Sequence, residues 1–333
     1  MPTITVESEA PEEFVRLAEG TRFGRGAARY RRAGLAAQLT RFRRPSFVVA
    51  RERGGVLGGC VLDPRRLRIR ERDHHGLYRA LLNVRAERAG EGIGRRIVAA
   101  ALDEADRLAG AFGEPVLSYG CVDARSGAPQ ALLAAHGARP IGTLTTRLLY
   151  RQWPRRRLAL ERAGPSCPRS VAEARALTSG CEADCGVRDV TARNLSPWCW
   201  SDAQGLAIVA EAQVSTLSFD TLGRVNDALV AALVTPFGFA RRRFDKAAFR
   251  HVRLSGLGVR AGAERDLPRF LDTLLAAHGC HHALLVIDPD RELAHRLRLH
   301  RAPASLQVMA RWHGAGAPAP AVQAPFGLYP VDV

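Results

Sequence analysis

A glycine-rich turn between a strand pattern and a long helical pattern restricts the fold of this chain more than any other feature. Residues 77–84 (LYRALLNV) have strand character, and residues 85–94 (RAERAGEGIG) form the turn. Beyond it the apolar residues return with the spacing of one helical face, at Ile97, Ala101, Ala105 and Leu108. A strand that passes through such a turn into a helix predicts an α/β fold, in which helices cover a sheet.

The first half of the chain alternates strand and helix patterns throughout. Strands are predicted at 3–6, 46–51, 56–62, 77–84, 116–122 and 143–150, with a hairpin turn at Gly54–Gly55. Helices are predicted to begin at Pro11 and to span 25–42, 94–108 and 130–135.

The second half repeats this order, which suggests an internal duplication of one α/β unit. Strands are predicted at 205–214, 227–234, 252–259, 283–287 and 306–312, and helices at 267–278 and 292–300. Proline, glycine and charge gather between the halves. We therefore expect a first domain at 1–152, a linker at 153–170 and a second domain at 171–333, each domain with a mixed sheet.

The turn itself can carry chemistry because it exposes backbone N–H groups at the start of a helix. The helix dipole adds roughly half a positive charge there, so the turn can hold a diphosphate. Gly90, Gly92 and Gly94 permit close approach of phosphate oxygens, and Arg95 can add charge-assisted hydrogen bonds. The spacing departs from the dinucleotide pattern GxGxxG, and the turn lacks the lysine of a P-loop. An acyl-CoA cradle and a turn that only packs are the remaining alternatives.

Two segments resemble the GCN5-related N-acetyltransferase (GNAT) family. Residues 82–97 (LNVRAERAGEGIGRRI) are similar to its acetyl-CoA motif, in which a strand ending V-x-P-x-x-R/Q-G-x-G-I-G leads into a helix. Residues 131–142 (ALLAAHGARPIG) are similar to the closing segment of the family. The resemblance covers residues 48–150 well and residues 200–313 weakly. It implies two tandem GNAT-like domains, of which the second is degenerate.

The resemblance implies acetyl-CoA or another acyl-CoA as the co-substrate. The backbone of Leu82, Asn83 and Val84 would pair with the pantetheine arm, where this strand and the next one splay apart. The diphosphate would lie on the turn formed by Ala89, Gly90, Glu91, Gly92, Ile93, Gly94 and Arg95.

The sequence departs from the family pattern at three positions that matter for chemistry. Ala89 stands where the family has Arg or Gln, and Glu91 brings a negative charge into the turn. Leu133 replaces a tyrosine that often protonates the leaving thiolate in the family. In the second half, the counterpart of the turn (258–268) holds two glycines and two acids, so we expect no CoA there.

Three residues are candidates for proton transfer, since an attacking amine must be neutral. His75 begins the strand before the turn, and an exposed loop position is its alternative. Asp123 follows the next strand, at the end where acceptors bind in the family, and helix capping is its alternative. Tyr78 can replace the missing tyrosine, unless it only packs. No Ser-His-Asp arrangement is legible, because no serine has a GxSxG context.

The formal charge of +16 argues only weakly for nucleic-acid binding. Just one of the 49 basic residues, Lys246, is a lysine, a bias typical of codon usage in a GC-rich genome. Aromatic residues are not interleaved with the basic runs, as single-strand binding would favour. The charge does suit an anionic ligand such as a phosphorylated cofactor.

The seven scattered cysteines predict reduced thiols in a cytoplasmic protein rather than a disulfide framework. Residues 278–282 (HGCHH) have metal-ligand chemistry, but adjacent strand residues point to opposite faces, and a turn before a strand explains them more simply. We expect no metal. We also expect no membrane contact, because no apolar stretch reaches the ~20 residues of a membrane helix. We expect no targeting signal, because the N-terminus (MPTITVESEAPEEF) is acidic and lacks an apolar core.

Together these features predict an acyl-CoA-dependent N-acyltransferase, with acetyl as the expected acyl group and a small amine or amino acid as the acceptor. The amine would attack the thioester directly in a ternary complex. A non-catalytic acyl-CoA-binding scaffold or sensor is the alternative that Ala89 and Leu133 favour. A basic nucleic-acid-associated protein is a third hypothesis, and a homodimer is left open.

Overall fold

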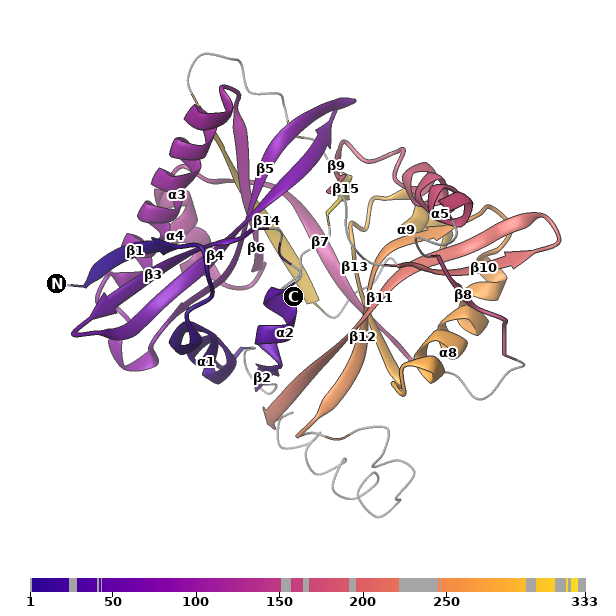
Figure 1. Cartoon of the computed structure of the whole chain (residues 1–333), viewed down its shortest axis with the longest axis horizontal. Helices are drawn as coiled ribbons and strands as arrows, with labels where there is room; N and C mark the ends of the chain where they lie inside the picture. Colours follow the sequence, from indigo (N-terminus) through magenta and orange to yellow (C-terminus); the bar gives the residue numbers. More distant parts are fainter. Residues whose placement is uncertain are drawn as a thin grey trace.

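The structure is a computed structural model in which two halves share one long mixed β-sheet (Figure 1). It describes residues 2–23, 29–40, 42, 44–150, 157–163, 168–191, 196–221, 245, 247–297, 304–314, 322 and 325–328. Helices cover the faces of the sheet, so the predicted α/β class with a mixed sheet is confirmed.

The described elements of the first half are four helices, a 3-10 turn and seven strands. The helices are α1 (Glu12–Gly20), α2 (Leu35–Leu39), α3 (Ile93–Phe112) and α4 (Gly127–Ala135), and the 3-10 turn is η1 (Ala86–Arg88). The strands are β1 (Thr3–Glu7), β2 (Arg29–Ala33), β3 (Ser46–Glu52), β4 (Gly55–Ile69), β5 (Arg72–Val84), β6 (Val116–Asp123) and β7 (Arg139–Tyr150).

The described elements of the second half follow in the same order. The helices are α5 (Pro168–Cys181), α8 (Leu267–Ala277) and α9 (Glu292–Arg296), and η3 (Glu264–Asp266) is a 3-10 turn. The strands are β8 (Glu161–Arg162), β9 (Val187–Asp189), β10 (Trp198–Asp202), β11 (Gly205–Thr221), β12 (Phe249–Val259), β13 (His282–Ile287), β14 (Ala304–His313) and β15 (Phe326–Gly327).

The predicted helix over 25–42 is wrong. Its described part consists of strand β2 and the short helix α2, separated by Gly34 in a left-handed conformation with φ +71°. Strand β2 pairs with β11 of the second half, and this distant partner overrides the local helical pattern. The strand predicted at 227–234 lies outside the described residues.

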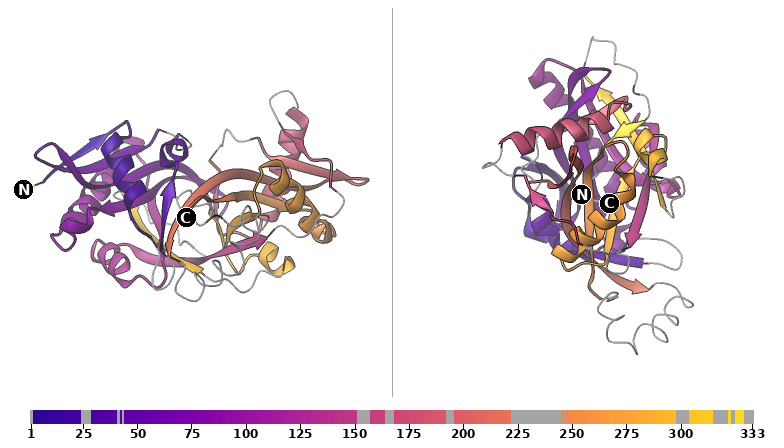
Figure 2. Two further views of the ribbon diagram at one scale, coloured as in Figure 1. Left: turned by 90° about the horizontal axis from the view of Figure 1, so that it is seen from below. Right: turned by 90° about the vertical axis from the view of Figure 1, so that its right-hand side faces the viewer.

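The sheet order is symmetric about its centre. It runs β1-β3-β4-β5-β6-β14-β7-β13-β12-β11-β10-β8, so that each strand of one half has a counterpart in the other. The two halves exchange their last strands: β14 pairs with β6 of the first half, and β7 pairs with β13 of the second (Figure 2). The boundaries at 152 and 170 stay a prediction, and the sheet is continuous across them.

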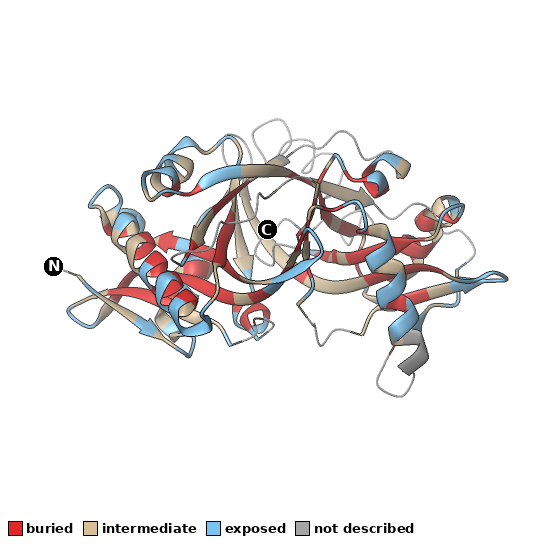
Figure 3. Cartoon of the chain, turned by 90° about the horizontal axis from the view of Figure 1, so that it is seen from above, coloured by how far each residue is buried: buried red, intermediate tan, exposed pale blue. Residues whose placement is uncertain are grey.

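Each half has its own apolar core, and the buried residues gather along the strands and the helix faces that pack on them (Figure 3). In the first half, α3 covers one face of the sheet through Ile97, Ala101 and Ala105. Helices α1 and α2 pack on the other face through Phe14 and Leu35. None of the helices in the described ranges is both long and apolar enough to cross a membrane.

Candidate functional site

The glycine-rich turn presents open backbone at the start of α3. Gly90 and Gly92 have φ values of +89° and +76°, a left-handed conformation that glycine adopts without strain. A Cβ placed on Gly90 would meet nothing within 4 Å. Gly92 is the N-cap of α3 and has no side chain to cap it. The first N–H groups of α3 are therefore available to a ligand.

The charges around the turn are arranged so that Glu91 is neutralised. Arg88 Nε donates to both carboxylate oxygens of Glu91 at 2.7 Å, and Arg88 Nη1 donates to Glu52 at 2.9 Å. These hydrogen bonds, to Glu91 first and then Glu52, raise the pKa of Arg88. Arg95 is exposed, and its Nη2 would lie 3.8 Å from a Cβ on Gly92. Arg95 is thus an exposed cation beside the turn.

Strand β5 contains a β-bulge shortly before the turn. Leu81 and Leu82 both face the single β4 residue Cys60. Leu81 has φ +54°, which is strained for a leucine, and Asn83 Nδ2 holds it by donating to Leu81 O at 3.0 Å. The side chain of Leu82 is turned outward, with 37% of the residue exposed.

Strands β5 and β6 part next to this bulge. Their parallel pairing covers His75–Tyr78 with Val116–Tyr119 and stops there, although β5 continues to Val84 and β6 to Asp123. Beyond Tyr78, the edge of β5 that faces β6 has no strand partner, in a region that the structure describes completely. Leu82, Asn83 and Val84 lie on this open stretch, which leads directly to the turn.

His75 does not lie near the splay, the place beyond Tyr78 where β5 and β6 separate. His75 is nine residues before Val84 on β5, a distance of roughly 30 Å along a strand. Its ring stacks on Phe112 at 3.9 Å, and its Nε2 lies 2.8 Å from Glu114 and 3.0 Å from Arg66 Nη1. Burial and the charge of Arg66 lower the pKa of His75, against the opposing effect of Glu114.

Tyr78 occupies a core position on β5. It is 1% exposed, its ring lies 5.3 Å from the Tyr119 ring, and the Arg65 guanidinium sits 5.6 Å from its centroid. The ring faces the side of the sheet that α1 and α2 cover, away from α3.

Asp123 lies at the same edge of the sheet as the turn, because β5 and β6 are parallel and both end there. The residue is exposed, and its Oδ1 accepts a hydrogen bond from the backbone N–H of Arg125 at 2.8 Å. Asp123 is therefore the predicted catalytic residue that the topology places near the splay, although the same carboxylate orders the loop before α4.

The position of the family's tyrosine is filled with an apolar side chain. Leu133 on α4 is 6% exposed and packs with Val98, Leu102 and Met309, between α3 and the sheet. It brings no hydroxyl to this part of the molecule.

A Ser-His-Asp chain that the sequence did not reveal crosses the first half. Ser118 Oγ lies 2.7 Å from His313 Nε2, and His313 Nδ1 lies 2.9 Å from Asp106 Oδ1. Ser118 is 0% exposed, and its hydroxyl is engaged with His313 Nε2. The chain instead ties β6, the exchanged strand β14 and helix α3 together. Such residues, from three distant segments, carry no local motif.

The second half repeats the bulge and the splay of the first. Gly256 and Leu257 of β12 both face Ala210, and Gly256 has φ +55°. The pairing of β12 with β13 covers only Val252–Leu254 and Ala283–Leu285. The glycine at this position is the signal from which the matching bulge at Leu81 could have been inferred.

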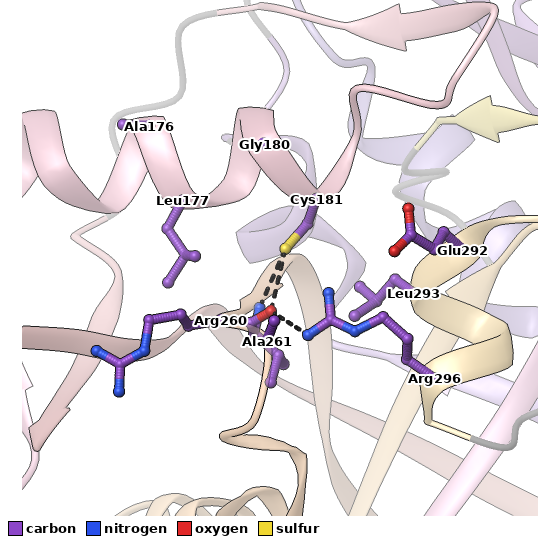
Figure 4. A pocket seen from close by; sticks show the side chains of 10 residues that line it. Ala176, Leu177, Gly180, Cys181, Arg260, Ala261, Glu292, Leu293 and Arg296 are labelled. Atoms are coloured by element: carbon purple, nitrogen blue, oxygen red, sulfur yellow. Dashed lines mark hydrogen bonds between the residues drawn. The ribbon is translucent and has the colours of Figure 1, made fainter. Parts of the chain in front are cut away.

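Helix α5 covers this second splay (Figure 4). The N–H of Val259 donates to Cys181 Sγ at 3.3 Å, and Thr178 Oγ1 donates to the carbonyl oxygen of Gly256 at 3.1 Å. Beside them is a cavity of about 260 Å³ with apolar and charged walls. It is lined by Ala176, Leu177, Gly180, Cys181, Val259, Arg260, Ala261, Glu292, Leu293 and Arg296.

The HGCHH segment is a turn, as predicted. His278 ends α8, Gly279 has φ +62°, and β13 begins at His282. Among the residues that the structure describes, no group of three His, Cys, Asp or Glu side chains is placed to hold a metal ion.

A search with family models and a search of curated proteins find no match to this chain. Solved structures do match it over nearly its whole length. N-myristoyltransferase from Saccharomyces cerevisiae, with bound myristoyl-CoA, has a TM-score of 0.61 at 8% identity and covers 99% of this chain and 82% of its own. A complex of that enzyme with myristoyl-CoA and inhibitors has a TM-score of 0.64 at 8% identity, covering 99% and 83%.

A GCN5-related N-acetyltransferase from Anabaena variabilis has a TM-score of 0.50 at 12% identity and covers 93% of this chain and 72% of its own. At such low identity these likenesses establish the fold alone. They confirm the expectation drawn from the two glycine-containing segments: the chain has a tandem GNAT fold.

Proposed function

We propose that this protein is an acyl-CoA-dependent N-acyltransferase with one cofactor site, which lies in its first half. The observation that carries this proposal is the junction of β5 and α3. There, a bulged strand with an open edge leads into a turn whose amides are free for a diphosphate.

The residues of the junction suit the three parts of CoA. The diphosphate lies on the amides of the turn 90–94, and Arg95 adds a charge-assisted bond to an outer oxygen. The pantetheine arm pairs with the open edge of β5 at Leu82, Asn83 and Val84. It also covers the exposed side chain of Leu82. The fold likeness to an enzyme with bound myristoyl-CoA supports an acyl-CoA as ligand.

The reaction is acyl transfer from the thioester to a neutral amine. The amine nitrogen forms a bond to the thioester carbon, the carbon–sulfur bond breaks, and the thiolate of CoA takes up a proton. Backbone N–H groups on the open edge of β5 stabilise the oxyanion that forms on the carbonyl. Asp123, exposed at the same edge, accepts the proton of the amine directly or through water. An acetyl group and a small amine remain the expected substrates.

The second half is closed to a second CoA. Its open strand edge is occupied by Thr178 and Cys181 of α5. The segment before α8 carries Glu264, which Arg296 binds, and Asp266 as N-cap. A diphosphate there would meet the carboxylates of Glu264 and Asp266.

The proposal is tested by CoA binding in calorimetry and thermal unfolding, with a matched pair of glycine variants. Gly92→Trp fills the diphosphate position at the N-terminus of α3. Gly113→Trp is the control, because Gly113 caps the other end of the same helix with φ +67° and nothing within 4 Å. Both variants bear a similar backbone strain.

Wild type and Gly113→Trp should bind CoA, acetyl-CoA and myristoyl-CoA. Ligand at 100 times its Kd should add about 2.7 kcal/mol to their free energy of unfolding. Gly92→Trp should fold, and ligand should not raise its free energy of unfolding. Binding by Gly92→Trp with wild-type affinity would place the cofactor elsewhere.

The non-catalytic acyl-CoA-binding protein stays the second candidate, because His75 lies far from the splay and Tyr78, which borders it, has its ring buried in the core. Release of free CoA thiol from acetyl-CoA in the presence of a panel of amines separates the two. Turnover that Asp123→Asn reduces, with CoA affinity unchanged, identifies the enzyme. Tight binding without turnover across the panel identifies the binding protein.

A further inference from the structure

Arg79 lies where β5 and β6 part. It is the first residue beyond Tyr78–Tyr119, the last pair of the parallel ladder. Gly120 on β6 lies against it: a Cβ there would be 2.9 Å from Arg79 O and 3.5 Å from Arg79 Cβ. A larger residue at 120 would push the two strands apart at this point. Gly120 thus lets Arg79 sit at the base of the splay.

The guanidinium of Arg79 is poorly partnered for a buried cation. Nη2 donates to Met309 O at 3.3 Å, whereas Nε and Nη1 are buried without a hydrogen-bond partner. Among the described residues no carboxylate lies within ion-pair distance of it. Burial raises the pKa of the nearby Cys60 thiol to about 12, so this group is not an anion either.

The surroundings of Arg79 are electropositive. Burial first, and the charge of Arg311, lower the pKa of Arg79 to about 10, so it is still charged at neutral pH. Arg311 forms an ion pair with Asp106, with its Nη2 3.9 Å from Asp106 Oδ2. His313 adds no negative charge. Asp106 is half-exposed, and it pairs with Arg311 and not with Arg79.

Elsewhere in the first half a buried guanidinium has its charge paired with carboxylates, although its Nε is also without a hydrogen-bond partner. Arg65 on β4, whose side chain is 5% exposed, binds Asp189 at 3.0 Å and Asp63 on its other side. A buried charge without such partners destabilises the fold. Arg79 differs from Arg65 in that no carboxylate of the described residues pairs with it.

We propose that Arg79 is a specificity-determining residue that binds a carboxylate of the reactants beside the thioester. This inference rests on the proposed function. The pantetheine arm runs from the turn along β5 towards Arg79, since the five residues from Val84 back to Arg79 span roughly 16 Å of strand. The reacting end of the cofactor therefore arrives at the base of the splay, where β5, β6 and β14 lie side by side (Figure 1).

A carboxylate matches this site better than a neutral carbonyl. The planar guanidinium offers parallel N–H groups to two oxygens, and a permanent negative charge offsets the permanent positive one. The carboxylate has two possible sources. It belongs either to a dicarboxylic acyl group, as in malonyl-CoA or succinyl-CoA, or to an amino acid that accepts the acyl group.

The experiment measures affinities by calorimetry, so that it does not depend on turnover. In the first arm, wild type and Arg79→Met are titrated with acetyl-CoA, malonyl-CoA and succinyl-CoA. In the second arm, each protein saturated with CoA is titrated with amino acids and with the corresponding amino-acid amides. Wild type should favour the carboxylate-bearing compound in one arm by roughly 10- to 100-fold. Arg79→Met should lose that preference and keep its affinity for CoA itself.

The stability of the ligand-free variants gives an independent readout. Arg79→Met removes an uncompensated charge at constant length, and its melting temperature should equal or exceed that of wild type. Arg65→Met is the matched control: it leaves Asp63 and Asp189 unpaired, and it should melt earlier. A drop for Arg79→Met as large as for Arg65→Met would make Arg79 a structural donor and overturn the inference.

The remaining outcomes separate this inference from the proposed function. CoA binding without a carboxylate preference in either arm, or with a preference that survives in Arg79→Met, overturns the role of Arg79 alone. Failure of wild type to bind CoA overturns both. A preference confined to one arm identifies which reactant carries the carboxylate.

Discussion

The buried imidazole of His251 should make the stability of this protein fall steeply below neutral pH. His251 lies on β12, is 2% exposed, and has its ring 5.7 Å from the ring of Phe249. Burial, and then the positive charge of Arg253, lower the pKa of His251 to about 4. The imidazole is therefore neutral in the folded protein at every pH above that value.

The sign of the effect follows from comparing the folded and unfolded chains. In the unfolded chain the pKa returns to about 6.5, so between pH 6.5 and pH 4 the unfolded chain binds a proton that the folded one does not. The stability that the neutral imidazole contributes is present above pH 6.5 and is lost as the pH falls. A difference of about 2.5 pKa units gives a total of about 3 kcal/mol, of which about 2 kcal/mol falls between pH 7.5 and pH 5.

Urea unfolding of wild type and His251→Gln at pH 7.5 and pH 5.0 measures this contribution. Wild type should lose about 2 kcal/mol more than the variant between the two pH values. His282, whose pKa is also lowered to about 4 by burial, is present in both proteins, so its own titration largely cancels. Equal losses in the two proteins would show that His251 titrates normally and would refute the argument.

Two further substitutions test the packing around the exchanged strands. Gly142→Ala on β7 would place a Cβ 1.9 Å from Cε2 of Phe326, so it should lower the free energy of unfolding by about 1–3 kcal/mol, and Phe326→Leu should restore part of it. Undiminished stability of Gly142→Ala would mean that Phe326 does not occupy this position. Ser118→Ala should cost about 1–3 kcal/mol in urea unfolding, because His313 Nε2 is left buried without its partner. An unchanged free energy of unfolding would mean that the hydrogen bonds of Ser118, His313 and Asp106 do not stabilise the position of β14.

The junction of β5, turn and α3 is predictable because its causes lie within a few residues. Gly90 and Gly92 meet the need for a left-handed backbone, and the apolar spacing after Gly94 commits the following residues to a helix. The predicted start of the helix, Gly94, is one residue from the observed Ile93. Local chemistry thus placed the strand, the turn and the helix correctly in the fold.

The exchange of β7 and β14 has no comparable local signal. Both segments have an ordinary strand pattern, and nothing in their residues says whether the partner is β6 or β13. The same holds for Arg29–Ala33, which forms a strand because β11 lies beside it. Arg79 was missed for a related reason, since its burial depends on Gly120 and Met309, which lie 41 and 230 residues further along the chain.

Under the proposed function, the comparison of the two halves separates features of the fold from features of the cofactor site. Leu81 and Gly256 have nearly the same φ, +54° and +55°, and each begins a bulge beside a splay. The nine-residue helix α1 leaves the edge of β5 open, whereas the C-terminal end of the longer α5 bonds to the edge of β12.

A bulged and splayed strand is therefore a property of the fold, and it persists where no cofactor is expected. A cofactor site needs two additional conditions: a turn with uncapped amides, and a strand edge that the chain's own helix does not occupy. The first half meets both conditions, through Gly92 and through the short α1. In the second half, Cys181 of α5 occupies the strand edge, and the carboxylate of Asp266 stands at the start of α8 without making a cap hydrogen bond. Under the proposed function, the occupied strand edge is the reason to expect an acyl-CoA in only one half of the symmetric sheet.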